Sequence, residues 1–145
     1  MYLLDTNVLS ELMRATPDPL VEARFESEPA ELFTSVICLE EIRFGAKIGP
    51  PGNKLWERAA DMLLPYLTVL ALTEQAALFA GDLRAEWKAR GTPVSYGDGL
   101  IAATARLAGL VTRNVRHFVH VEGLAVENWF ESPQPPRLRP GNGQP

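Results

Sequence analysis

The chain has 145 residues, of which 46% are hydrophobic and 22% are charged, and its net charge at pH 7 is −4. This length predicts one globular domain with a hydrophobic core of its own. The acidic balance argues against a general nucleic-acid binder with a large basic face, but it is compatible with an enzyme that holds phosphodiesters through metal ions.

The first half of the chain alternates short apolar runs with segments of helical spacing. Residues 1–4 are apolar and end at Asp5, which predicts a buried first strand. A helix is predicted over 7–14, because Val8, Leu9 and Leu12 share one face and Pro17 follows. The remaining predicted elements of this half are a helix over 20–28, a strand over 31–34, a helix over 35–48 and a helix over 54–64.

The second half continues the same alternation. Its predicted elements are a strand over 68–72, a helix over 73–90, a helix over 100–108, and two short strands over 110–112 and 124–127. The long helix ends at Gly91, and a loop leads from there to Asp98. Strands that alternate with helices predict an α/β domain with a mainly parallel sheet.

The domain is expected to cover residues 1–131. Residues 132–145 are rich in Pro and Gly and offer almost nothing to bury, so they are predicted to form a disordered tail. No apolar run reaches the roughly 18 residues that span a bilayer, and the N-terminus lacks the pattern of a signal peptide. The lone Cys38 lies in an apolar stretch and is expected to be a core thiol, so we expect a cytoplasmic protein without membrane association.

Three polar residues lie where an open parallel sheet binds its ligands, beyond the carboxyl ends of the strands. Asp5 follows the first predicted strand, Asp98 opens a helix, and Asn114 follows the strand over 110–112. Each position also has a structural explanation. Asp5 and Asp98 are good helix N-caps, and Asn114 is a common turn residue. Position alone leaves both explanations open.

One predicted helix carries Glu40 and Glu41 side by side. Glu40 shares a face with Val36 and Phe44, whereas Glu41 shares a face with Ile37. Either stripe could face the interior, and solvent exposure is the ordinary state of such acids. Helical periodicity therefore does not choose between them.

Five short segments, in the order and spacing in which they stand here, are typical of one enzyme family. They are LLDTNVLSE at 3–11, SVICLEEIRFG at 35–45, DGLIAATA at 98–105, VTRNVRHF at 111–118 and the pair Asn128-Trp129. Together they resemble the PIN-domain ribonucleases, and they are most similar to the VapC toxins of bacterial toxin–antitoxin pairs, including the FitB-like branch. Each motif alone is weak, whereas five in order over about residues 1–131 are specific.

The resemblance implies a role for each candidate site residue. It makes Asp5 the first metal-binding acid, Glu41 rather than Glu40 the helix acid, and Asp98 the third, while the fourth position of the family falls on Asn114. It also implies an α/β/α sandwich, dependence on Mg²⁺ or Mn²⁺, RNA as the substrate, a VapB-like antitoxin as partner, and a homodimer.

The chemistry of such a site follows from its donor atoms. Neighbouring carboxylates stay ionised only if a cation neutralises them, and oxygen ligands without a Cys or His cluster favour a hard divalent ion. We expect Asp5 and Asp98 to be direct ligands, with Glu41 orienting a metal-bound water or joining as a third ligand. The hydroxyl and amide groups expected to hold these carboxylates are those of Thr6, Asn7 and Thr112.

Two departures from the family pattern concern the fourth position. The segment 108–112 is about two residues shorter than usual, and His117, expected to be exposed and unrelated to the acids, replaces a common Asp. The main alternative is therefore a weakly active or inactive PIN-like module that binds nucleic acid or a partner. A phosphatase with an aspartyl nucleophile is disfavoured, because Asn7 stands where that chemistry needs a second Asp.

Overall fold

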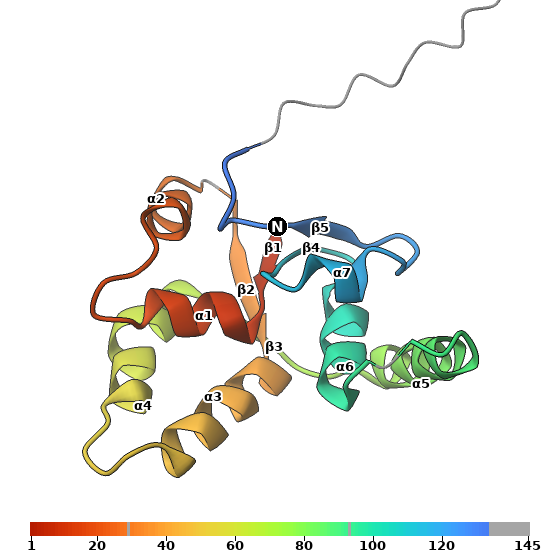
Figure 1. The fold of residues 1–145 in the computed structure, drawn as a ribbon, viewed down its shortest axis with the longest axis horizontal. Coiled ribbons are helices and arrows are strands. Elements are labelled where there is room, and N and C mark those ends of the chain that lie inside the picture. The colour runs from red at the N-terminus through yellow and green to blue at the C-terminus, as the bar shows by residue number, and fades with distance from the viewer. Residues whose placement is uncertain (29, 93, 134–145) are drawn as a thin grey trace, which may run out of the picture.

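The computed structural model describes residues 1–28, 30–92 and 94–133 (Figure 1). The predicted disordered tail, 132–145, lies outside the described residues from 134 onward and stays a prediction. None of the described helices is long and apolar enough to cross a membrane.

Five short strands form one sheet in the order β3-β2-β1-β4-β5. The strands are β1 (Tyr2–Leu4), β2 (Leu32–Ser35), β3 (Thr68–Leu70), β4 (Gly109–Val111) and β5 (Ala125–Glu127). All four pairings are parallel, so the sheet predicted as mainly parallel is wholly parallel in the described part of the chain. β1 lies at the centre, between β2 and β4, and the carboxyl ends of all five strands therefore face the same edge.

The helices cover both faces of the sheet, as a buried parallel sheet requires. They are α1 (Thr6–Leu12), α2 (Pro19–Ser27), α3 (Val36–Ile48), α4 (Leu55–Arg58), α5 (Glu74–Ala89), α6 (Tyr96–Ala105) and α7 (Val115–Phe118). Figure 1 shows α1 to α4 on one side of the sheet, with α5 and α6 on the other. The expected α/β/α sandwich is confirmed.

Three helical segments differ from the prediction, and one of them is α6, which spans Tyr96–Ala105 where a helix over 100–108 was predicted. The helix predicted over 54–64 is α-helical only at α4 and continues as a π-helix (Ala59–Leu63) and a 3₁₀ helix (Leu64–Tyr66). Pro65 has no N–H to donate, so the α-helical bond pattern cannot continue through that residue. The short helix α7 was not predicted, because four residues are too few to show a period.

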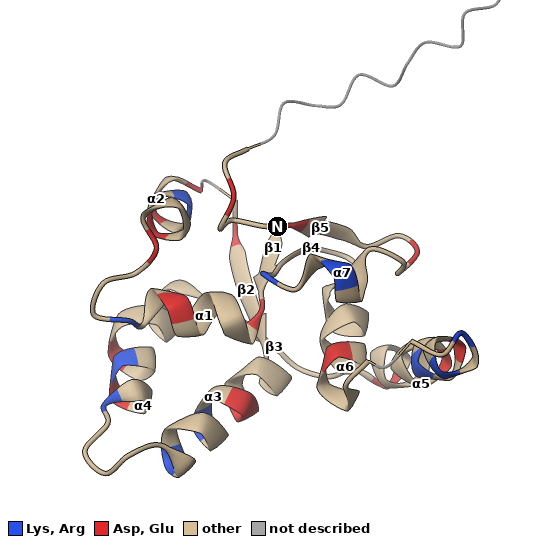
Figure 2. Ribbon diagram, in the orientation of Figure 1, with Lys and Arg blue, Asp and Glu red and all other residues tan. Residues whose placement is uncertain are grey.

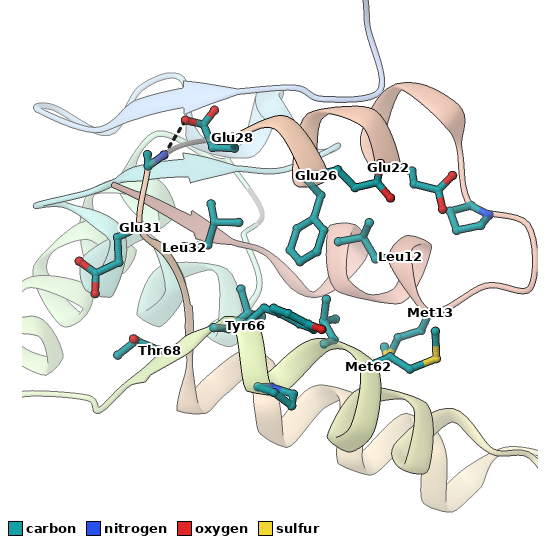
Figure 3. Close-up of a pocket in the computed structure, with 16 residues that line it drawn as sticks. Leu12, Met13, Glu22, Glu26, Glu28, Glu31, Leu32, Met62, Tyr66 and Thr68 are labelled. Carbon is teal, nitrogen blue, oxygen red and sulfur yellow. Dashed lines mark hydrogen bonds between the residues drawn. The ribbon is translucent and has the colours of Figure 1, made fainter.

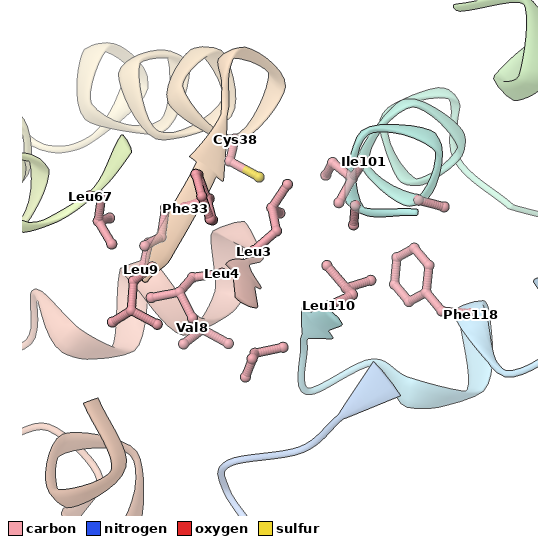
Figure 4. Close-up of a cluster of buried hydrophobic side chains, with 14 of the residues drawn as sticks. Leu3, Leu4, Val8, Leu9, Phe33, Cys38, Leu67, Ile101, Leu110 and Phe118 are labelled. Atoms are coloured by element: carbon pink, nitrogen blue, oxygen red, sulfur yellow. The ribbon is translucent and has the colours of Figure 1, made fainter. Parts of the chain in front are cut away.

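The core lies on both sides of the sheet. Figure 4 shows Ile101 of α6 and Phe118 of α7 beside Leu110 on one side, with Leu9 of α1 on the other. These four side chains are almost completely buried. Cys38 is buried as predicted, and its burial raises the pKa of the thiol, which keeps the sulfur protonated.

Candidate active site

The neighbouring strands β1 and β4 bring Asp5 and Thr112 together at their carboxyl ends. Asp5 follows β1 directly, and its backbone N–H donates to the carbonyl of Val111, the last residue of β4, at 3.0 Å. The Thr112 hydroxyl donates to Asp5 Oδ2 at 2.7 Å, and both residues are buried. A contact between residues 107 positions apart thus depends on the strand order.

The two carboxylate oxygens of Asp5 are held by different groups. Oδ1 accepts from the backbone N–H of Thr6 at 2.7 Å, so Asp5 is the N-cap of α1. Oδ2 accepts from the Thr112 hydroxyl and also from Asn7 Nδ2, the latter at 3.1 Å. Asp5 is therefore a helix cap and a candidate ligand at once, and the two interpretations of its position do not exclude each other.

Glu41 lies between the starts of α1 and α6. Its Oε2 accepts a hydrogen bond from the Thr6 hydroxyl. Its Oε1 lies so close to Gly97 that a Cβ at that position would stand 2.6 Å from it. Glu40 is exposed, together with Phe44 on the same stripe of α3. The choice of Glu41 over Glu40, made from motif resemblance, thus selects the acid that faces Thr6 and α6.

Asp98 lies in the first turn of α6 and is not the cap of that helix. Ser95 is the N-cap, and its hydroxyl accepts from the backbone N–H of Asp98 at 3.1 Å. The explanation of Asp98 as a helix cap is therefore wrong. Asp98 Oδ2 lies 3.0 Å from Nδ1 of His117, a residue that was expected to be unrelated to the acids.

Asn7, Thr112 and Asn114 form a hydrogen-bonded connection between α1 and the segment after β4. Asn7 Nδ2 lies 3.2 Å from the Thr112 hydroxyl, which also accepts from the backbone N–H of Asn114 at 3.1 Å. Asn7 Oδ1 accepts from the backbone N–H of Arg113 at 3.0 Å. The Asn114 side chain is exposed, and within the described residues it forms no hydrogen bond to Asp5, Glu41 or Asp98. Thr6 hydrogen-bonds to Glu41, and Asn7 and Thr112 hydrogen-bond to Asp5.

The acids affect one another electrostatically. The pKa of Asp5 is raised to about 6, chiefly by burial. The hydrogen bonds from Thr112 and Thr6 lower this pKa, and the negative charges of Asp98 and Glu41 add to the increase. Figure 2 shows the acidic segments of α3 and α6 near the end of β1, with a basic segment on α7. A cation among these groups would favour the ionised form of Asp5.

The donor set fits a hard divalent ion. All candidate donors are carboxylate oxygens, which Mg²⁺ and Mn²⁺ prefer. Among the residues that the structure describes, no three His, Cys, Asp or Glu side chains are poised to share a metal. Mg²⁺ keeps several of its waters and needs only one or two protein carboxylates, a number that Asp5 and Asp98 together would supply.

Three contributors were missed in the sequence. Gly97 lies against Glu41, His117 contacts Asp98, and Ser95 caps α6. Ser95 could have been found, because a Ser three residues before an acid, ahead of an apolar run, is a pattern that indicates a helix start. No local sequence pattern predicts the contacts of Gly97 and His117, since both depend on how separate elements pack.

A separate cavity of about 720 Å³ lies away from these acids, among α1, α2 and the helical turns before β3 (Figure 3). Its walls include Leu32 and Thr68, which begin β2 and β3, so it opens at the amino ends of these strands. Its charged wall residues are Glu22, Glu26, Glu28 and Glu31. The cavity contains none of the candidate site residues.

Comparison with known proteins agrees with this geometry. A family model, PIN domain, matches residues 2–124. The tRNA(fMet)-specific endonuclease VapC of Salmonella typhimurium is 33% identical over 132 residues, which cover 88% of this chain and 97% of that protein. Toxin FitB of Neisseria gonorrhoeae is 32% identical over 139 residues, which cover 90% of this chain and 100% of that protein.

Solved structures show the same likeness. FitAcB from Neisseria gonorrhoeae superposes with a TM-score of 0.79 at 31% identity, covering 91% of this chain and 100% of that one. VapBC2 from Rickettsia felis, bound to a DNA fragment from its promoter, gives a TM-score of 0.78 at 26% identity, covering 88% and 98%. Because the family model spans most of the chain and the relatives match over nearly their full length, the chain belongs to the PIN domain family.

Proposed function

We propose that this chain is the toxin of a toxin–antitoxin pair and an endoribonuclease that hydrolyses RNA phosphodiesters with Mg²⁺ or Mn²⁺. The observation that carries the proposal is the buried Asp5 carboxylate at the joined ends of β1 and β4, with the charges of Glu41 and Asp98 acting on it. Relatives of nearly the same length that are named as an endonuclease and a toxin support it.

We propose different roles for the three acids and for the hydroxyl groups that contact them. Asp5 and Asp98 would hold the ion directly, and Glu41 would orient a water or join when RNA binds. When bound, the ion supplies an activated water and positive charge for the phosphoryl oxygens. Thr6 and Thr112 keep the carboxylates of Glu41 and Asp5 in place through their hydroxyl groups.

The proposed partner is a VapB-like antitoxin. Support comes from the FitAcB and VapBC2 structures and from a Klebsiella pneumoniae structure described as a toxin–antitoxin complex, which this chain also resembles, with a TM-score of 0.69 at 27% identity. A homodimer is proposed on the motif resemblance alone.

The test of the activity is cleavage of single-stranded RNA by purified protein freed of any partner, and Glu41 and Glu40 provide a matched pair of variants. We expect cleavage with Mg²⁺ or Mn²⁺ and none with a chelator. Glu41→Gln should lower the rate about 10- to 100-fold, the usual cost of losing a group that orients a metal ligand. Glu40→Gln, which removes the same charge from the neighbouring exposed position, should leave the rate unchanged.

Two outcomes would contradict the proposal. Equal rates for the two variants would exclude Glu41 from the site. No cleavage by the wild-type chain with any divalent ion would favour the alternative, a PIN-like module that binds nucleic acid or a partner without cutting.

A substitution at Gly97 gives a second test of the role of Glu41, because it should lower the cleavage rate without lowering the stability of the protein. A methyl group at Gly97 would meet Glu41 Oε1 at 2.6 Å, so Gly97→Ala should push the carboxylate away from its present position. Alanine is favoured over glycine within a helix by about 1 kcal/mol, so thermal unfolding should occur at the same or a higher temperature. We expect the cleavage rate to fall about tenfold. Ala77→Gly, on the exposed face of α5, is the converse control and should lower stability without affecting cleavage.

A further inference from the structure

A pocket of about 380 Å³ lies beside the acidic site, on the segment that follows β4. Its walls include Arg113, Asn114, Arg116, His117 and Glu131. His117 joins it to the acids, because its Nδ1 lies 3.0 Å from Asp98 Oδ2. We call this the arginine pocket.

The charge of the arginine pocket is opposite to that of the chain as a whole. Two arginines line it in a protein whose net charge is −4. In the part of the chain that the structure describes, neither Arg113 nor Arg116 forms an ion pair with an acid. Glu131 is the acid in the wall, and its Oε1 accepts from Asn128 Nδ2 at 2.9 Å. By contrast, the charged wall residues of the cavity beside α2 are all glutamates.

Arg113 is held in place at both of its ends. Its backbone N–H donates to Asn7 Oδ1, and the same Asn7 donates to Asp5. Its guanidinium carbon lies 4.0 Å from the centre of the Phe130 ring, a cation–π contact. The backbone that carries the arginine pocket is therefore tied directly to the hydrogen-bonded group around Asp5.

Asn114 belongs to this pocket by geometry. Its side chain is exposed and lines the pocket. Within the described ranges, its connection to the acidic site is the hydrogen bond from its backbone N–H to the Thr112 hydroxyl. An amide side chain offers hydrogen-bond donors to a phosphate oxygen. This position next to the arginines suits a contact with substrate better than a contact with a metal.

We propose that the arginine pocket binds the RNA phosphate next to the one that is cut. The inference rests on the proposed ribonuclease function and extends it to a substrate subsite. A hard cation among the acids would hold the phosphate that reacts. A second positive group is then needed to fix the direction in which the RNA strand lies across the protein. Arg116 and Arg113 supply it, since guanidinium groups bind phosphate oxygens through paired hydrogen bonds.

The test measures RNA binding without cleavage, in full-length protein that carries Asp5→Asn. Binding of a labelled single-stranded RNA is followed by fluorescence anisotropy at several salt concentrations. Adding Arg116→Gln should weaken binding about tenfold, the usual value of a charged hydrogen bond. The slope of log affinity against log salt should become less steep by about 0.7, one phosphate contact on a single strand. Arg116→Lys should restore the slope, because it restores the charge.

Lys54→Gln is the matched control. It removes one positive charge from the exposed residue before α4, on the other side of the molecule from α7 (Figure 1). Equal effects of Arg116→Gln and Lys54→Gln on RNA affinity and on the salt slope would contradict the proposal that the arginine pocket binds a phosphate. This holds even if the wild-type chain cleaves RNA. If the salt slope depends on Arg116 but the wild-type chain never cleaves RNA, the arginine pocket is a phosphate site of a binding module, and both the ribonuclease proposal and the placement beside a cut phosphate are overturned.

Discussion

Replacing Asp5 by asparagine is expected to abolish RNA cleavage while leaving the protein folded. Groups that merely orient a metal ligand cost about 10- to 100-fold when removed, so the loss of a direct ligand should cost at least about 100-fold. Asparagine keeps an oxygen that can accept from the Thr6 backbone N–H and so keeps the cap of α1. Cleavage rates with saturating Mg²⁺, measured beside circular dichroism of the same samples, would check both parts.

The matched control for this substitution is Asp82→Asn, which removes an acid from the exposed surface of α5 and should cleave RNA at the wild-type rate. Full cleavage by Asp5→Asn would remove Asp5 from the site and leave it only the role of a helix cap. Cleavage that also survives a chelator would point to a contaminating nuclease.

The metal-free protein is expected to gain stability as the pH is lowered through the pKa of Asp5. That pKa is about 6 in the folded chain, whereas the pKa of an aspartate in an unfolded chain is about 3.9. Above about pH 6 the folded state carries an ionised, buried carboxylate that the unfolded state solvates freely. Between these two values the folded state binds a proton that the unfolded state does not, so its stability rises by up to about 3 kcal/mol as the pH falls.

The measurement is urea unfolding with a chelator, at several values between about pH 7.5 and pH 4.5. The difference between wild type and Asp5→Asn isolates the contribution of Asp5, because the other titrating groups are common to both. As the pH falls, the free energy of unfolding of the wild type should increase relative to that of Asp5→Asn. Parallel curves for the two proteins would show that the Asp5 carboxylate is no harder to ionise in the folded chain than in water.

Magnesium should largely offset this pH dependence of stability. A carboxylate must be ionised to bind a metal, so Mg²⁺ competes with the proton for Asp5. At 100 times its dissociation constant a ligand stabilises the folded state by about 2.7 kcal/mol. We expect that gain near pH 7.5, and we expect it to diminish as the pH falls and to be reduced in Asp5→Asn.

Much of the fold could be predicted because its signals are local. The alternation of apolar runs with helical spacing indicated the parallel sheet, and Pro and Gly marked most helix ends. Boundaries differed where a side chain decides them, as at α6, which begins before Asp98 because Ser95 caps it. The acid of α3 could be chosen only from motif resemblance, since both stripes of that helix carry apolar residues.

The sequence by itself determined the strands, most helices and the acids that stand at strand and helix ends. Only the tertiary structure decided which of these residues meet. Asp5 and Thr112 come together because β1 lies beside β4, and Glu41 and Thr6 because α3 packs against α1. His117 reaches Asp98, and Asn114 turns to the arginine pocket, through the path of the chain after β4. A local sequence pattern shows which face of one helix or strand is buried. A site consists of contacts between several elements, and no single segment of the sequence specifies how those elements are ordered in space.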